Sequence, residues 1–186
     1  MSQKTVYINF FDSIDPVKVN KFIHFTTEVI RQHNPTELYF FISSNGGDVD
    51  SGFVLYNFLI SLQGKLKISM HNTGTIDSIA NVIFVAGQSR YAAPNASFLF
   101  HGVSMNMQGG VSRAALKEAL SRLEGMENRI ATTVSKHSQL TEAELTSLFL
   151  QGEGKNVQFA LDKQIIQEIK IPSVPAGSIH LAMAFV

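Results

Sequence analysis

The stretch LKISMHNTGTIDSIAN, residues 66–81, decides the fold class of this chain. Apolar and polar side chains alternate over residues 66–70, which is typical of a strand. A tight turn at Gly74 follows, and an apolar segment from Ser78 to Ala86 predicts a helix that Gly87 closes. A strand that passes through a short turn into a helix is the building unit of an α/β protein with a mostly parallel sheet.

Strands and helices alternate along the rest of the chain in the same way. The first helix has clear boundary signals, since Asp15 is a good N-cap, Pro16 a good first helical residue and Asn34-Pro35 a stop signal. We predict strands over residues 4–11, 38–42, 66–70, 97–101 and 165–171 and near Tyr91, and helices over 16–34, 55–62, 78–86 and 112–137 and from Thr141 and Asn156. We therefore expect one α/β domain over residues 1–186, with an apolar tail, residues 172–186, packed on the domain or on a neighbour.

The composition excludes several classes of function. The 186 residues carry no net formal charge and no long basic run, which argues against nucleic acid as the main partner. There is no cysteine, so disulfides and thiolate chemistry are excluded. The N-terminus lacks an apolar signal region and no apolar run could span a bilayer, so we expect a cytoplasmic protein with no membrane partner. No histidines or acidic residues have metal-ligand spacing, so neither a metal nor a cofactor is expected.

Ser78 is the first candidate for a catalytic residue. It lies at the predicted start of an apolar helix, where backbone N–H groups have no intrahelical partner and can donate to a developing oxyanion. The Gly46-Gly47 loop also follows a buried strand and opens a helix, and neighbouring parallel strands would bring the two helix starts together. The amides of Gly47 and Ile79 would then form an oxyanion hole. A serine at such a position, or Asp77 before it, is more often a simple helix cap.

A serine nucleophile needs a base, and His101 is the best candidate. It ends the predicted strand over residues 97–101, and Gly102 follows it, so its ring should lie at the mouth of a loop. A histidine at the end of a strand is more often structural than catalytic. His71, which is close to Ser78 in sequence, is the rival base.

Four motifs follow one another in order: FISSNGG at residues 41–47, GTIDS at 74–78, AG at 86–87 and PNASFLFH at 94–101. Together they resemble the proteolytic subunit of the Clp protease, over about residues 4–171. The resemblance implies the crotonase-like α/β superhelix, which is built from β-β-α units. It also implies that Ser78 is the nucleophile and His101 the base. The oxyanion amides would be those of Gly47 and Ile79.

The resemblance further implies a protruding handle over about residues 103–137. Residues 112–137 would be its long helix, through which the rings of the family stack. Met105–Gly110 would be an adjoining strand whose edge pairs with an extended substrate. On this basis we expect a homo-oligomer of stacked rings, with sites that face an internal chamber and act on peptides or unfolded proteins.

Three departures from the family pattern bear on activity. Gly152 stands where the third catalytic residue of the family, an aspartate, is expected. The adjacent Glu153, an asparagine or a backbone carbonyl is then left to orient the histidine. Asn45 replaces the usual proline before the paired glycines, which a turn tolerates. The chain starts only a few residues before Tyr7, which puts docking to an ATP-dependent unfoldase in doubt.

These observations support three hypotheses about function. The first is a serine-type endopeptidase of the Clp type that hydrolyses peptide bonds inside an oligomeric chamber. The second is a catalytically impaired or regulatory ring subunit, for which Gly152 is the best support. The third is a crotonase-fold acyl-CoA enzyme, since that fold also holds an oxyanion with paired amides. The order of Ser78 and His101, and the lack of an acidic catalytic residue at these loops, argue against it.

Overall fold

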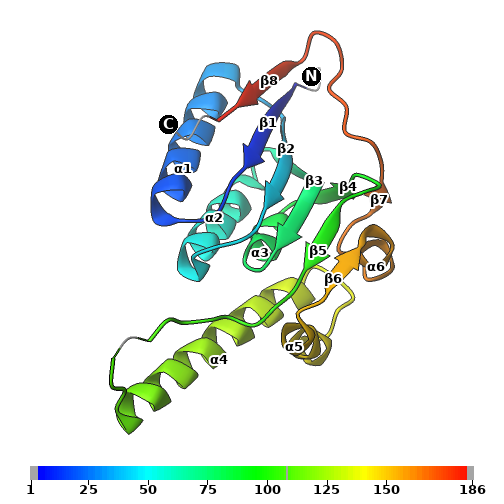
Figure 1. Ribbon diagram of the computed structural model, residues 1–186. Helices are drawn as coiled ribbons and strands as arrows, with labels where there is room; N and C mark the ends of the chain where they lie inside the picture. Colours follow the sequence, from blue (N-terminus) through cyan, green and yellow to red (C-terminus); the bar gives the residue numbers. More distant parts are fainter. Residues whose placement is uncertain (1–3, 108, 184–186) are drawn as a thin grey trace.

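The computed structural model describes residues 4–107 and 109–183. Its elements, in chain order, are β1 (Thr5–Phe11), α1 (Pro16–His33), β2 (Glu37–Ser44), α2 (Val49–Leu62), β3 (Lys67–Asp77), α3 (Ala80–Phe84), β4 (Ser89–Ala92), β5 (Ser97–Leu99), α4 (Arg113–Ser135), α5 (Glu142–Gln151), β6 (Gly154–Asn156), α6 (Val157–Asp162), β7 (Glu168–Ile169) and β8 (Ile179–Ala182) (Figure 1). These strands form one sheet with the main order β6-β5-β3-β2-β1-β8, while β4 pairs with β3 and β7 with β4. Among the described strand pairs, only that of β5 and β6 is antiparallel. The predicted mixed α/β fold with a mostly parallel sheet is confirmed.

The predicted capping residues begin and end α1 and begin α5. Asp15 caps α1 by accepting a hydrogen bond from Lys18 N, and Asn34 ends the helix in a left-handed conformation. α5 begins with a capping box, in which the side chains of Thr141 and Glu144 each accept a hydrogen bond from the backbone of the other. Local side-chain chemistry thus determines where these helices begin.

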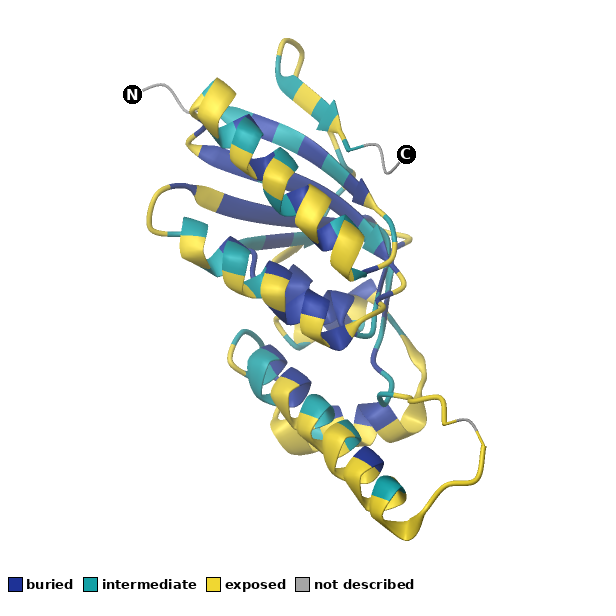
Figure 2. Ribbon diagram, turned by 90° about the vertical axis from the view of Figure 1, so that its left-hand side faces the viewer, coloured by how far each residue is buried: buried dark blue, intermediate teal, exposed yellow. Residues whose placement is uncertain are grey.

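Helices α1, α2 and α3 cover one face of the sheet (Figure 1). Phe22 of α1 packs edge-on against Phe10 of β1, with ring centroids 5.3 Å apart, and it also contacts Phe40 of β2. The strands beneath these helices are largely buried, as the dark blue ribbons in Figure 2 show. The opposite face of the sheet carries a group of aromatic side chains around Tyr39 and His71. In sheets of this kind, ligands bind at the carboxyl ends of the strands, which is where we look for a site.

Strand β3 differs from the prediction around Gly74. We expected a tight turn there, but the strand continues through Gly74 to Asp77, with an irregular register against β2. A Cβ atom on Gly74 would lie 2.6 Å from Ser43 Oγ, so this glycine permits the close approach of two strands rather than a turn. The strand therefore leads directly to Ser78, and the helix predicted from that residue starts only at Ala80.

The C-terminal segment contains a strand that the sequence pattern did not reveal. The strand predicted over residues 165–171 is reduced to β7, whereas β8 lies in the tail, where the sequence shows little periodicity. β8 pairs in parallel with β1, and Ile179 lies opposite Val6. Its side chains alternate only between half-buried and exposed, so its hydrophobic signal is weak. The described part of the tail packs on the edge of the chain's own sheet.

Helix α4 projects from the body of the molecule, below the sheet in Figure 1. It confirms the helix predicted over residues 112–137. The strand predicted at Met105–Gly110 is not formed, because residues 105–107 and 109–110 pair with no described strand, and residue 108 lies outside the described residues. The described residues of this segment lie outside the sheet, and a strand forms only where a neighbouring strand supplies backbone hydrogen bonds. Within the described ranges, no helix has the combination of length and hydropathy that a bilayer-spanning segment requires.

Candidate active site

Ser78 lies in a sharp turn at the end of β3. Its backbone is left-handed, with φ of 56°, a conformation that costs a residue with a side chain about 1–3 kcal/mol. Hydrogen bonds hold it there: Ser78 N donates to Leu99 O at 2.9 Å, and the buried Asn81 Nδ2 donates to the carbonyls of Ser78 and Leu99 at 3.1 and 3.0 Å. The N-cap of α3 is Ile79, and no side chain caps it. The alternative that Ser78 or Asp77 simply caps this helix is therefore wrong.

The Gly46-Gly47 loop lies against Ser78, as the parallel sheet predicts. A Cβ atom on Gly46 would lie 2.7 Å from Ser78 Cβ, and one on Gly47 would lie 2.1 Å from Ile14 O. Both glycines have positive φ, 84° and 147°. No other residue type could bring this backbone so close to the serine.

The two amides predicted to hold an oxyanion have no hydrogen-bond partner among the described residues. The loop around Gly47 is tied down on both sides, since Ile14 N donates to Gly46 O and Asp48 N donates to Ile14 O, each at 2.8 Å. These bonds leave Gly47 N free, and Ile79 N is also free. Unpaired N–H groups are rare where the backbone is buried, as it is at Ile79, whereas Gly47 is exposed and its amide is open to solvent. Both amides are therefore available to an acceptor that enters the site.

His101 follows β5 and lines the same cleft as Ser78, a hollow of about 450 Å³. Its Nδ1 lies 2.8 Å from Gly102 O. A carbonyl oxygen only accepts, so Nδ1 carries the proton and the lone pair is on Nε2. No hydrogen bond joins Ser78 to His101, both of which are described; such bonds are often long before substrate binds. Apolar side chains form much of the rest of the cleft: Val49, Val103, Met105, Leu123 and Met126.

Residues 4–170 match the family model described as Clp protease.

The chain belongs to the Clp protease family.

Two curated relatives carry the same printed name, ATP-dependent Clp protease proteolytic subunit 2. The one from Pseudomonas aeruginosa is 27% identical over 142 residues, which cover 73% of this chain and 70% of the relative. The one from Borreliella burgdorferi is 33% identical over 66 residues, which cover 34% of this chain and 32% of the relative.

Gly152, at the expected aspartate position of the Clp protease family, is the C-cap of α5. Its φ of 59° is left-handed, and open space surrounds the place of its Cβ. The neighbouring Glu153 is exposed and forms an ion pair with Lys155 Nζ at 3.2 Å. Among the described residues, neither position forms a hydrogen bond with the His101 ring, whose partner is the carbonyl of Gly102.

The rival base His71 does not line the cleft. It is fully buried on the aromatic face of the sheet, where its two ring nitrogens bond to Tyr39 OH at 2.9 Å and Lys170 O at 3.0 Å. Burial lowers the pKa of His71 to about 4. With both nitrogens occupied and no access to Ser78, His71 has a structural role.

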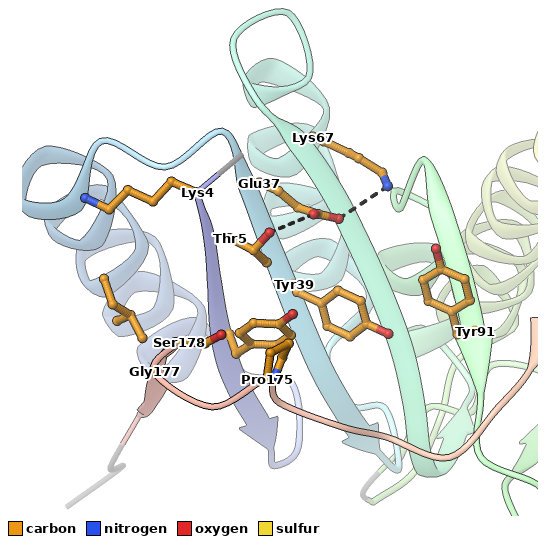
Figure 3. A pocket seen from close by; sticks show the side chains of 11 residues that line it. Lys4, Thr5, Glu37, Tyr39, Lys67, Tyr91, Pro175, Gly177 and Ser178 are labelled. Atoms are coloured by element: carbon orange, nitrogen blue, oxygen red, sulfur yellow. Dashed lines mark hydrogen bonds and ion pairs between the residues drawn. The ribbon is translucent and has the colours of Figure 1, made fainter. Parts of the chain in front are cut away.

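A second hollow, of about 590 Å³, lies on this aromatic face (Figure 3). Tyr39 and Tyr91 stack there, with ring centroids 5.8 Å apart, and burial raises the pKa of Tyr39. The buried Glu37 accepts a hydrogen bond from Thr5 Oγ1 at 3.0 Å and pairs with Lys67 Nζ at 3.3 Å. None of the residues lining it is a histidine, so it lacks the base that a serine nucleophile would need.

Proposed function

We propose that this chain is a serine-type endopeptidase that hydrolyses peptide bonds in unfolded proteins or peptides. One observation carries the proposal: Ser78 is held in a left-handed conformation and lines one cleft with Gly47 and His101, while the amides of Gly47 and Ile79 have no hydrogen-bond partner among the described residues. Strained serines presented in this way are typical nucleophiles. Membership of the Clp protease family supports the same reaction class.

In the proposed mechanism, Ser78 Oγ attacks the carbonyl carbon of the scissile peptide. His101 Nε2 takes the hydroxyl proton and later gives it to the leaving amine. The Gly47 and Ile79 amides donate to the oxyanion, and each such donor contributes about 3 kcal/mol in the transition state. Water then hydrolyses the acyl-enzyme by the same proton transfers in reverse.

We also propose that the chain assembles into stacked rings that enclose the sites. The projecting helix α4 supports this, because Leu116 and Leu120 on its surface are 54% and 57% exposed. Met105 and Met107 in the adjoining segment are also exposed, so an apolar surface is available to a second copy. The printed names of the relatives describe subunits of an ATP-dependent protease, which makes an unfoldase a candidate partner.

The test is fluorophosphonate labelling of the purified protein, followed by peptide cleavage assays. We expect labelling of the wild type, none in Ser78→Ala, and at least a 100-fold slower reaction in His101→Ala. Native mass spectrometry should show the same oligomer for all three proteins. Full activity in Ser78→Ala would refute the proposal.

A second candidate is a catalytically impaired ring subunit. Two observations favour it: Gly152 supplies no carboxylate, and Ser78 makes no hydrogen bond to His101. An intact oligomer that neither reacts with fluorophosphonate nor cleaves peptides would support this second function.

A further inference from the structure

We propose that Glu127 of α4 is a positioning residue that holds His101 in its reactive orientation through the peptide unit joining Gly102 to Val103. The inference rests on the proposed peptidase function. In it, Glu127 takes the orienting role of the aspartate that the family pattern expects at Gly152. The carboxylate comes from the long helix and not from the segment around Gly152.

Two hydrogen bonds on opposite sides of one peptide unit carry the proposal. Val103 N donates to Glu127 Oε1 at 2.9 Å. The carbonyl of that peptide unit, Gly102 O, accepts the proton of His101 Nδ1 at 2.8 Å. Carboxylate, peptide and imidazole therefore form one continuous chain of hydrogen bonds.

The physical effect follows from polarisation. A charge-assisted bond from the peptide N–H to a carboxylate shifts electron density toward the carbonyl oxygen and makes it a stronger acceptor. That oxygen then holds Nδ1–H more firmly and favours the imidazolium that forms when Ser78 gives up its proton. A neutral carbonyl alone would orient His101 without any contribution from a negative charge.

The loop at Gly102 leaves room for the Glu127 carboxylate and is fixed in place by a second helix. A Cβ atom on Gly102 would lie 2.8 Å from Glu127 Oε1, so a side chain there would push the carboxylate away. Gly102 N donates to Phe149 O at 3.1 Å, which ties the loop to α5 as well. Among the described residues, no lysine, arginine or histidine forms an ion pair with Glu127, so its charge is not neutralised by another side chain.

The kinetic test compares Glu127→Leu, Glu127→Gln and the control Glu124→Leu, an exposed position one turn earlier on α4. Glutamine keeps an acceptor for the Val103 amide but removes the charge, whereas leucine removes both. We expect fluorophosphonate labelling of Ser78 to slow about 10-fold in Glu127→Gln and about 100-fold in Glu127→Leu. KM for a peptide should stay within about twofold and Glu124→Leu should behave as wild type, because only proton transfer is affected.

The second readout is independent of activity. In protein labelled with ¹⁵N-histidine, NMR should show the His101 ring protonated at Nδ1, with the signal assigned by its absence in His101→Ala. Glu127→Leu should shift this ring toward the other tautomer without changing the melting temperature of the oligomer by more than the control does. A wild type that never labels, with the tautomer still dependent on Glu127, would reject the peptidase function but support the positioning role. Unchanged labelling rates and an unchanged tautomer in both Glu127 variants would overturn the inference.

Discussion

His71 lies in strand β3 and His101 lies just after strand β5, in two regions of opposite character. His101 is half-buried and lines the Ser78 cleft, where one ring nitrogen is bonded to a backbone carbonyl and the other has no hydrogen-bond partner among the described residues. His71 is fully buried under the aromatic face, where both nitrogens have partners. The pKa of His71 is lowered to about 4 because burial disfavours the charged ring.

The difference shows that residue type and nearness in sequence do not make a base. A general base needs a free lone pair and access to the nucleophile, and it must tolerate a positive charge during the reaction. The cleft meets these needs by leaving polar groups without partners: the Gly47 and Ile79 amides and one nitrogen of His101. The aromatic face pairs its polar groups and contributes to stability instead.

The largest expected effect is on the cleft side, from Gly47→Ala. The new Cβ would meet Ile14 O at 2.1 Å, and φ of 147° disfavours any side chain. We expect a loss of at least about 3 kcal/mol in the free energy of unfolding, measured by urea denaturation. Gly64→Ala is the matched control, since nothing lies within 4 Å of its Cβ position. Equal stability of the two variants would show that the cleft backbone is not held as tightly as the contacts indicate.

A second experiment measures how the free energy of unfolding depends on pH through His71, on the aromatic face of the sheet. The pKa of His71 is about 4 in the folded chain and about 6.5 when unfolded, so the unfolded chain binds more protons between these values. This contribution to the stability is then fully present above pH 6.5 and falls as the pH drops toward 4, by on the order of 3 kcal/mol. His71→Phe should remove this slope from urea titrations between pH 6.5 and 4. It should also leave the labelling rate of Ser78 per folded molecule unchanged; a tenfold slower rate would give His71 a role in the cleft.

The smallest expected effect is that of Gly152→Asp, which adds the carboxylate that the Clp protease family pattern predicts at this position. The left-handed backbone at Gly152 should cost about 1 kcal/mol of stability. Because the His101 ring already bonds to Gly102 O, we expect Ser78 labelling to change less than about threefold. A gain of 100-fold or more would mean that the peptide-bridged carboxylate does not replace the aspartate.

Much of the fold was predictable because its signals are local. Asp15 and Asn34 begin and end α1, and the capping box at Thr141 begins α5. The alternation of strands and helices required a mostly parallel sheet, and adjacent strands then had to bring the Gly46-Gly47 loop beside Ser78. The weakly patterned β8 was missed because an edge strand with half-exposed side chains buries too little apolar surface to leave a period in the sequence.

The sequence by itself determined the family, the alternation of strands and helices, and which serine, histidines and amides are candidates for one site, since these depend on residue type and spacing along the chain. Only the tertiary structure decided between His101 and His71, placed Ser78 outside its helix and brought Glu127 within hydrogen-bond distance of Val103. Each of these depends on burial and on contacts between separate elements, because a hydrogen bond across 24 positions leaves no periodic trace in a single sequence.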